Sequence, residues 1–406
     1  MSKPAKKKPV STQATSSLSE SMLRRLVQSL SIVEDPRSPQ GIRHPLVNVL
    51  TIAVLGCMCR CDDAEALEDW GNKEKDWLAD FLDMPHGVPS QDVFLRVFAS
   101  IDPVSFRQAF HVWVSEVFEL LGVEQQFAID GQTHRRSGSR GKGQKPVHMV
   151  HALVCEAGLV MGQTATDEKS NEIKAIPAVL ELLDLRGALV SIDAMGTQVK
   201  IAKQIVNAGG DYLLALKGNQ TNLAKEVTEA FEEALDDRRR TVDEEPPPAV
   251  SEATNVDSGH GRLETRTARV LTDFKPWVPA SKRWPSIRSL VAITATREDL
   301  TTGKESTETR YYISSRELSA KEANARVRAH WLVENQLHWC LDMTFGQDAC
   351  RIRTGNAAEN FAVVRHFALN LIRSYKGDRY SVPRRRRLCD YKREYRERVL
   401  WGTAKA

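Results

Sequence analysis

The sequence predicts an α/β protein with an all-helical N-terminal domain, a mixed sheet with flanking helices, and a β-rich insertion. Up to about residue 121, apolar residues recur at spacings of three and four, as on amphipathic helices. After Gly122 the chain alternates short apolar strands with helices, in the order strand, strand, strand, helix, strand, helix, strand. Antiparallel strands followed by βα units predict a mixed sheet with right-handed crossovers.

Length and composition set the broad class. The 406 residues allow two or three domains, and 41% hydrophobic with 27% charged residues is typical of a globular protein. No apolar run reaches the length of a membrane span, and no apolar segment follows the N-terminal lysines, so we expect a cytoplasmic protein without a membrane partner. The seven cysteines are then expected to be reduced thiols.

Basic residues gather near both ends of the chain, around Lys6 and in the run Arg384 to Arg387. Solvated tails are the plainer interpretation of such runs. Basic segments at both ends nevertheless favour a polyanionic partner.

The elements divide the chain into six segments. In the helical domain, Ser90 and Asp102 are the expected N-caps of two helices. In the insertion we expect an acidic helix and three alternating strands, and after it a long helix from about Ala320 that carries Glu334. The segments are a disordered basic tail (1–17), the helical domain (18–122), the first part of the sheet core (123–219), the β-rich insertion (220–316), the C-terminal core helices (317–376) and a basic C-terminal tail (377–406).

Three carboxylates are the candidate catalytic residues. Asp130 and Asp193 each end an apolar strand, and if these strands are neighbours the two side chains lie together at one edge of the sheet. Glu334 stands among apolar residues on nearly all sides of its helix, so we expect it to be buried. Three acids repel one another unless cations lie between them, and oxygen ligands select Mg²⁺ or Mn²⁺. Two such ions, about 4 Å apart, would serve an in-line phosphoryl displacement.

Plainer interpretations exist for each acid alone. Asp130 could cap a turn through Gly131, and Glu334 could pair with an arginine. His330, Glu334 and His338 share a helical face and could bind zinc, but the pattern is not an established zinc signature. For the three acids together we favour the catalytic interpretation.

Long motifs then match a known family. The segments AIDGQTHR, TDEKSNEIKAIPAVLELLDLRGALVSIDAMGTQ, SGHGRLETR and HWLVENQLHWCLDMTFGQD resemble, in order, the DDE transposases of the ISAs type, which include the H-repeat-associated proteins. The resemblance covers residues 25 to 375. It implies an RNase H-like catalytic core, with Asp130, Asp193 and Glu334 as catalytic residues and as ligands of two Mg²⁺ or Mn²⁺ ions.

The resemblance also implies the reaction and the partners. Such enzymes hydrolyse a DNA strand at transposon ends and then join the freed 3′-hydroxyl to target DNA. The N-terminal helical domain would bind the transposon ends, and a homodimer would assemble on paired ends. Related enzymes often carry a tyrosine, an arginine and a lysine where this chain has Val327, His330 and Leu341. A second acid common in relatives is replaced by Gln347.

Further residues are candidates for DNA contact. Lys217 and Asn219 follow the fifth strand and could hold a phosphate, or they could simply cap a helix. A glycine-rich basic stretch after the first strand could follow a DNA backbone or be a solvated loop. Two histidines on the Glu334 helix could contact phosphate or pack in the core. These residues are Arg135, Arg136, Arg140, Lys142 and Lys145 in the stretch, and His330 and His338 on the helix.

Two other functions stay open. The chain could be an RNase H-like nuclease with no strand-transfer step, or an inactive DNA-binding regulator on the same scaffold. A nuclease would cut DNA without joining it, and a regulator would bind DNA whether or not the three acids were present.

Overall fold

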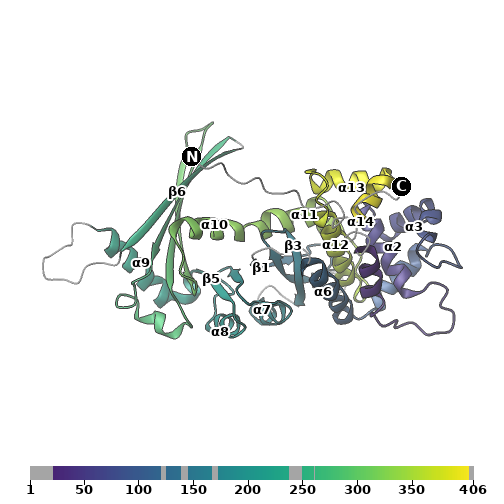
Figure 1. The fold of residues 1–406 in the computed structure, drawn as a ribbon, viewed down its shortest axis with the longest axis horizontal. Coiled ribbons are helices and arrows are strands. Elements are labelled where there is room, and N and C mark those ends of the chain that lie inside the picture. The colour runs from purple at the N-terminus through teal and green to yellow at the C-terminus, as the bar shows by residue number, and fades with distance from the viewer. Residues whose placement is uncertain are drawn as a thin grey trace, which may run out of the picture. The chain divides into compact units, whose positions relative to one another are not determined.

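The computed structural model describes residues 22–119, 125–138, 145–166, 172–236, 249–259 and 261–401, so the expected tail at 1–17 lies outside it. The chain forms two compact units, which we describe separately (Figure 1). Unit 1 comprises Met1–Gly122, His134–Val147 and Trp339–Ala406; unit 2 comprises Val123–Thr133 and His148–His338. Over the described residues, no helix combines the length and the apolar character that crossing a bilayer requires.

Over the residues that the structure describes, unit 2 is built on one mixed sheet of nine strands, in the order β3-β2-β1-β4-β5-β9-β8-β7-β6. The antiparallel strands β1 to β3 are followed by β4 and β5, which run parallel to β1. This is the RNase H-like arrangement, and it confirms the predicted α/β fold class. The first five strands are β1 (Gln126–Thr133), β2 (His148–Val154), β3 (Leu159–Thr166), β4 (Leu189–Ile192) and β5 (Asp211–Leu216). The helices among them and after them are α7 (Glu172–Glu181), α8 (Val199–Asn207), η3 (Gly218–Gln220) and α9 (Thr221–Leu235).

The insertion continues the core sheet, because β9 pairs with β5. Its described residues form four antiparallel strands, one more than the sequence pattern predicted. The extra strand is β6, in a stretch that is polar and almost wholly exposed, so it carries none of the apolar alternation that marks a half-buried strand. The elements are β6 (Val250–Gly259), β7 (Arg262–Leu271), η5 (Pro279–Arg283), β8 (Ser289–Asp299) and β9 (Glu305–Ser314).

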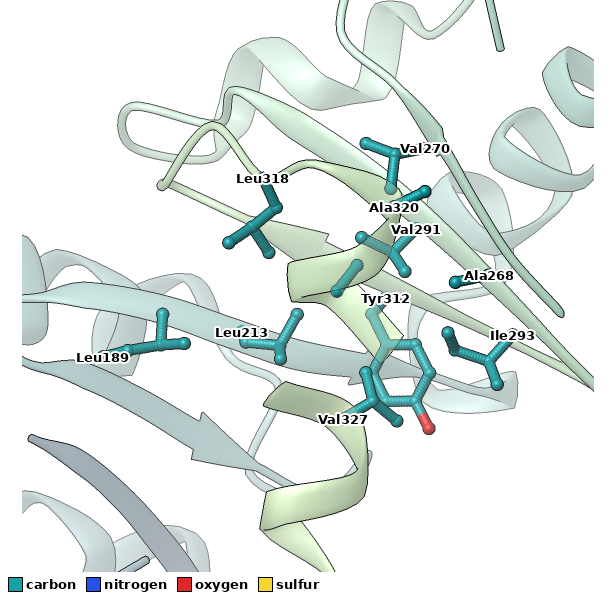
Figure 2. Packing of buried hydrophobic residues seen from close by; sticks show 11 residues of the cluster. Leu189, Leu213, Ala268, Val270, Val291, Ile293, Tyr312, Leu318, Ala320 and Val327 are labelled. Carbon is teal, nitrogen blue, oxygen red and sulfur yellow. The ribbon is translucent and has the colours of Figure 1, made fainter. Parts of the chain in front are cut away.

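Helix α10 (Ala320–His330) ties the insertion to the core strands. It begins at Ser319, whose hydroxyl accepts the N–H of Glu322 while the Glu322 carboxylate accepts the N–H of Ser319. Figure 2 shows its apolar side packed on residues from both parts of the sheet. The cluster comprises Leu189 and Leu213 from β4 and β5, the insertion residues Ala268, Val270, Val291, Ile293 and Tyr312, and Leu318, Ala320, Ala323 and Val327. The packing of α10 therefore fixes the position of the segment after it, which carries Glu334, on the core strands.

The described part of unit 1 is all-helical, as predicted for the N-terminal domain, but the unit also contains residues 339–406. We expected the core helices to span 317–376, and the structure divides that segment between the two units. The reason is α12, whose residues are buried on nearly every side against the N-terminal helices. Phe361 packs on Phe98, and Phe367 on Phe106. The helices are 22–30, α2 (Leu46–Met58), α3 (Ala64–Lys73), α4 (Lys75–Ala79), α5 (Gln91–Ser100), α6 (Pro103–Glu119), α11 (Trp339–Met343), η7 (Gln347–Ala349), α12 (Ala357–Ser374), α13 (Val382–Tyr391) and α14 (Arg393–Trp401).

The predicted basic C-terminal tail at 377–406 is wrong where the structure describes it, because α13 and α14 fold onto unit 1. Three of its arginines are buried. Arg396 pairs with the buried Glu74, and Arg386 pairs with Asp62 and donates to the carbonyl of Cys57. A buried guanidinium is tolerated only with such partners, so these arginines hold helices together and are not available to DNA.

The two expected N-caps differ in the structure. The carboxylate of Asp102 accepts the N–H of Ser105, as a helix N-cap does. Ser90 occupies the N-cap position of α5 but its side chain makes no capping hydrogen bond.

Candidate active site

Asp130 lies on β1, and Asp193 directly follows the last residue of the neighbouring strand β4. In the parallel pairing of β1 with β4, Ile129 lies opposite Ile192, so the two aspartates that follow lie opposite each other. Side chains alternate across a strand, and Gln126, Asp130 and Gln132 share one face of β1. Gln126 and Gln132 donate to backbone carbonyls of Arg326 and His338, which places this face toward α10 and the segment after it.

The Asp193 carboxylate is fixed by the turn that follows β4. Its Oδ1 accepts the backbone N–H groups of Met195 and Gly196, at 3.1 and 3.2 Å. Thr197 Oγ1 donates to the carbonyl of Ala215 on β5, which secures the turn against the next strand. A Cβ at Gly196 would lie 2.4 Å from Ile192 Cγ2, so the turn needs glycine at this position.

Glu334 lies on a π-helix, η6 (Val333–His338), and not on the continuous α-helix that the sequence predicted. The wider turn changes which side chains face the sheet: Val333 and Leu337 are buried, whereas Glu334 is exposed. The expectation of a buried Glu334 was therefore wrong, because the apolar residues around it do not enclose it. Short π segments are frequent at functional sites.

The three acids nevertheless influence one another. Burial raises the pKa of the Asp130 carboxyl to about 7; the N–H of Gly131, which Oδ1 accepts at 2.8 Å, lowers the pKa, and the charges of Asp193, Glu334 and Glu172 raise it. Only 17% of the Asp130 side chain is exposed. Without a cation, this part of the sheet edge therefore holds more negative charge than it can easily accommodate.

Both histidines of the Glu334 segment are half-buried. His330 Nδ1 lies 3.1 Å from Ser191 Oγ on β4, and burial lowers the pKa of His330 to about 4. Burial, followed by the charges of His148 and His330, lowers the pKa of His338 to about 4 as well. His338 Nδ1 is 3.7 Å from Asp130 Oδ2, too far for a hydrogen bond. Burial thus favours the neutral form of both rings, and the phosphate contact that we considered for His330 and His338 stays a prediction.

The other candidate DNA contacts fall in different places. Lys217 and Asn219 are exposed, and Asn219 Nδ2 donates to the carbonyl of Ala194, so the β5 loop lies at the Asp193 turn. Arg135 and Arg136 belong to unit 1 and are exposed, with Arg135 paired to Asp348. In the same basic stretch, residues 140 and 142 lie outside the described chain, and residue 145 is exposed.

A cavity of about 320 Å³ opens on the α10 side of the insertion, within unit 2. Its wall includes Asn335, the neighbour of Glu334, and Trp331, over whose ring Arg310 lies at 4.8 Å. Arg266 also lines it, and over the described residues its Nε has no hydrogen-bond partner. Cationic side chains thus stand directly beside the segment that carries Glu334.

Asp130, Asp193 and Glu334 supply carboxylate oxygens, the donor type that Mg²⁺ and Mn²⁺ prefer. The raised pKa of Asp130 marks negative charge that a cation would offset. Within the described part of the chain, no three His, Cys, Asp or Glu side chains are arranged to hold a metal ion. The residues therefore fit a divalent ion in chemistry, and a shared site would require the exposed Glu334 side chain to turn toward the two aspartates.

Comparison with known proteins gives the family. The domain described as "Transposase DDE domain" matches residues 122–371, and "DDE_Tnp_1-associated" matches residues 27–114. The chain belongs to the DDE transposase family. It is 37% identical to "Putative transposase YncI" of Escherichia coli O157:H7 over 93% of this chain and 95% of that protein. It is 35% identical to "H repeat-associated putative transposase YhhI" of E. coli K12 over 94% of this chain and 99% of that protein.

Among solved structures, the "piggyBac transposase synaptic complex with hairpin DNA" aligns over 95% of this chain and 84% of that chain. The alignment has a TM-score of 0.38 and 10% identity, a likeness too weak to support an inference.

In this DDE transposase, two buried residues near Asp130 escaped the sequence analysis. His148 on β2 and Glu172, the first residue of α7, are 2% and 4% exposed. His148 Nε2 and Glu172 Oε1 are 2.7 Å apart. The available signal was a glutamate at the start of the apolar helix that crosses between β3 and β4, a position where a carboxylate also benefits from the helix dipole.

Proposed function

We propose that the chain is a metal-dependent DNA transposase that cleaves a DNA strand at transposon ends and joins the freed 3′-hydroxyl to target DNA. The observation that carries the proposal is the alignment of Asp130 with Asp193 on adjacent parallel strands, with Glu334 near enough for its charge to raise the pKa of Asp130. Family membership and the RNase H-like sheet support the same reaction.

Asp130, Asp193 and Glu334 would hold two Mg²⁺ or Mn²⁺ ions. When bound, such ions activate an attacking oxygen and offset charge on the leaving oxygen. Asp193 Oδ1 accepts two backbone N–H groups of the turn after β4, which holds the carboxylate in place. Glu334, on the π-helix η6, would supply the third carboxylate.

Residues around the acids would position DNA. Lys217, exposed in the loop that Asn219 anchors at the Asp193 turn, would contact the backbone of the strand being cut. Arg266 and Arg310, in the cavity beside Asn335, would contact phosphates next to the cleavage point. Such contacts contribute salt-dependent affinity and not sequence specificity. We assign recognition of the transposon ends to the helical domain, and we propose a homodimer on paired ends.

The test uses purified full-length chain, Mg²⁺ or Mn²⁺, and plasmid DNA carrying the element that encodes the chain with its natural flanks. We expect strand breaks at the element's ends and, with a second plasmid, joined products. Asp130→Asn, Asp193→Asn and Glu334→Gln should each abolish both products. Asp184→Asn is the matched control, because Asp184 lies in the same unit with its side chain 60% exposed and paired to Arg186.

The outcomes separate the alternatives. Cut ends without joined product would indicate an RNase H-like nuclease. DNA binding that depends on salt but not on metal, and that survives loss of all three acids, would indicate a regulator. Cleavage that is unchanged in Asp193→Asn would refute the proposed active site. Light scattering with DNA ends present would show one chain or two per complex and so test the homodimer.

A further inference from the structure

A chain of hydrogen-bonded side chains runs beneath the end of β1, on the face opposite Asp130's. Thr133 Oγ1 lies 2.7 Å from His148 Nδ1, and His148 Nε2 lies 2.7 Å from Glu172 Oε1. A carboxylate only accepts, so Nε2 carries the proton given to Glu172, and in the neutral ring Nδ1 accepts the hydroxyl of Thr133. The three groups thus fix one another's orientation, and Glu172 is a buried carboxylate held by a histidine.

Gly131 connects this chain to Asp130. A Cβ at Gly131 would lie 2.4 Å from Glu172 Oε1 and 2.5 Å from His148 Nε2, closer than side chains can approach. The imidazole and the carboxylate therefore pack against the backbone of Gly131. The N–H of the same residue donates to Asp130 Oδ1. His148 and Glu172 therefore contact the residue whose N–H orients the Asp130 carboxylate.

We propose that His148 and Glu172 form a positioning dyad that sets the divalent-ion affinity of the Asp130 site. The inference rests on the proposed function only in taking Asp130 as an ion ligand. The dyad acts in two ways: its contact with Gly131 holds the Asp130 carboxylate in place, and the buried charge of Glu172 adds negative potential beside it. The Glu172 carboxylate lies against Gly131, the residue that follows Asp130.

Many metal sites contain residues that hold a ligand in place without binding the ion themselves, and the dyad would play this part. Groups that orient a ligand without touching the ion typically change metal affinity by about 10-fold to 100-fold when they are removed. A structural role alone would lower stability but leave ion affinity unchanged in the folded protein. The two roles can therefore be separated by measuring binding and folding in the same variants.

The experiment is calorimetric titration of the full chain with Mn²⁺, without DNA, alongside thermal unfolding of each variant. Glu172→Gln keeps an acceptor for His148 and removes the charge, so it should fold and bind Mn²⁺ about 10-fold more weakly. Glu172→Ala also removes the contact and should approach a loss of about 100-fold. Glu181→Gln, exposed at the other end of α7, is the matched control and should bind like wild type.

Cleavage assays add a second readout. In Glu172→Gln the Mn²⁺ concentration for half-maximal cleavage should rise with the dissociation constant, and saturating Mn²⁺ should restore the wild-type rate. Mn²⁺ affinity unchanged in a folded Glu172→Gln would overturn the dyad while leaving the proposed function intact. Wild-type protein that binds no Mn²⁺, or binds it unchanged in Asp130→Asn, would contradict the proposed metal site and the dyad together. If Glu172→Ala does not fold, the Mn²⁺ affinity of Glu172→Gln still tests the dyad.

Discussion

Replacing Asp130 by asparagine should stabilise the protein when no divalent ion is present. The buried carboxyl has a pKa of about 7, against an ordinary value of 3.8. A raised pKa in the folded state means that the stability this group contributes is complete below about pH 4 and is lost as the pH rises through about 7. Asparagine has nearly the same shape, still accepts the N–H of Gly131, and cannot ionise.

The magnitude follows from the size of the rise in pKa. Each tenfold change in proton affinity corresponds to about 1.4 kcal/mol. At about pH 8 the ionised Asp130 therefore costs up to about 4 kcal/mol of folding free energy, which Asp130→Asn would recover. The gain should shrink steadily as the pH falls toward about 4, where the carboxyl is protonated in both the folded and the unfolded chain.

The assay is urea denaturation in EDTA at several pH values, followed by hydrogen exchange of peptides from β1 and β4, because Asp130 lies in unit 2. Adding Mg²⁺ should stabilise the wild type and have little effect on Asp130→Asn. The difference in unfolding free energy between the two proteins should therefore shrink or change sign. Asp184→Asn, which removes an exposed carboxylate, is the control. An Asp130→Asn variant that is no more stable than wild type at about pH 8 in EDTA would refute the reasoning.

Three further outcomes follow from the same contacts. Arg396→Met should destabilise unit 1 by about 3–5 kcal/mol in urea denaturation, because Glu74 loses its buried partner. The control Arg387→Met, at an exposed position of α13, should leave stability unchanged. Equal losses of stability in the two variants would contradict the buried pairing. Glu334→Gln should lower the pKa of Asp130 measured by NMR, since the charge of Glu334 raises it. An unchanged pKa would mean that the two carboxylates are too far apart to interact. Mn²⁺ affinity should fall about tenfold per pH unit below about pH 7, as a proton competes for Asp130, and a pH-independent affinity would argue against that ligand.

The sequence carried enough information to find the two aspartates. Each follows a short apolar strand, and we expected the two side chains to lie together if these strands were neighbours. The parallel pairing of β1 with β4 meets that condition. The turn at Asp193 was equally accessible, since a carboxylate two residues before a free backbone N–H commonly accepts it.

Other features left no signal in a single sequence. Glu334 lies on a π-helix, and the hydrophobic pattern of these residues fits an α-helix equally well. Strand β6 is exposed on both faces, so hydrophobic alternation does not mark it. A basic run such as Arg384 to Arg387 looks solvated, and only the fold reveals that Arg386 meets Asp62 and the carbonyl of Cys57.

The most direct measurement is anomalous X-ray diffraction from crystals of the full chain soaked in Mn²⁺, recorded at the manganese absorption edge. The expected result is density between Asp130 and Asp193, with the Glu334 carboxylate turned in from its exposed position to share it. Manganese bound elsewhere, or none at these acids in protein that still cleaves DNA, would contradict the three-carboxylate site.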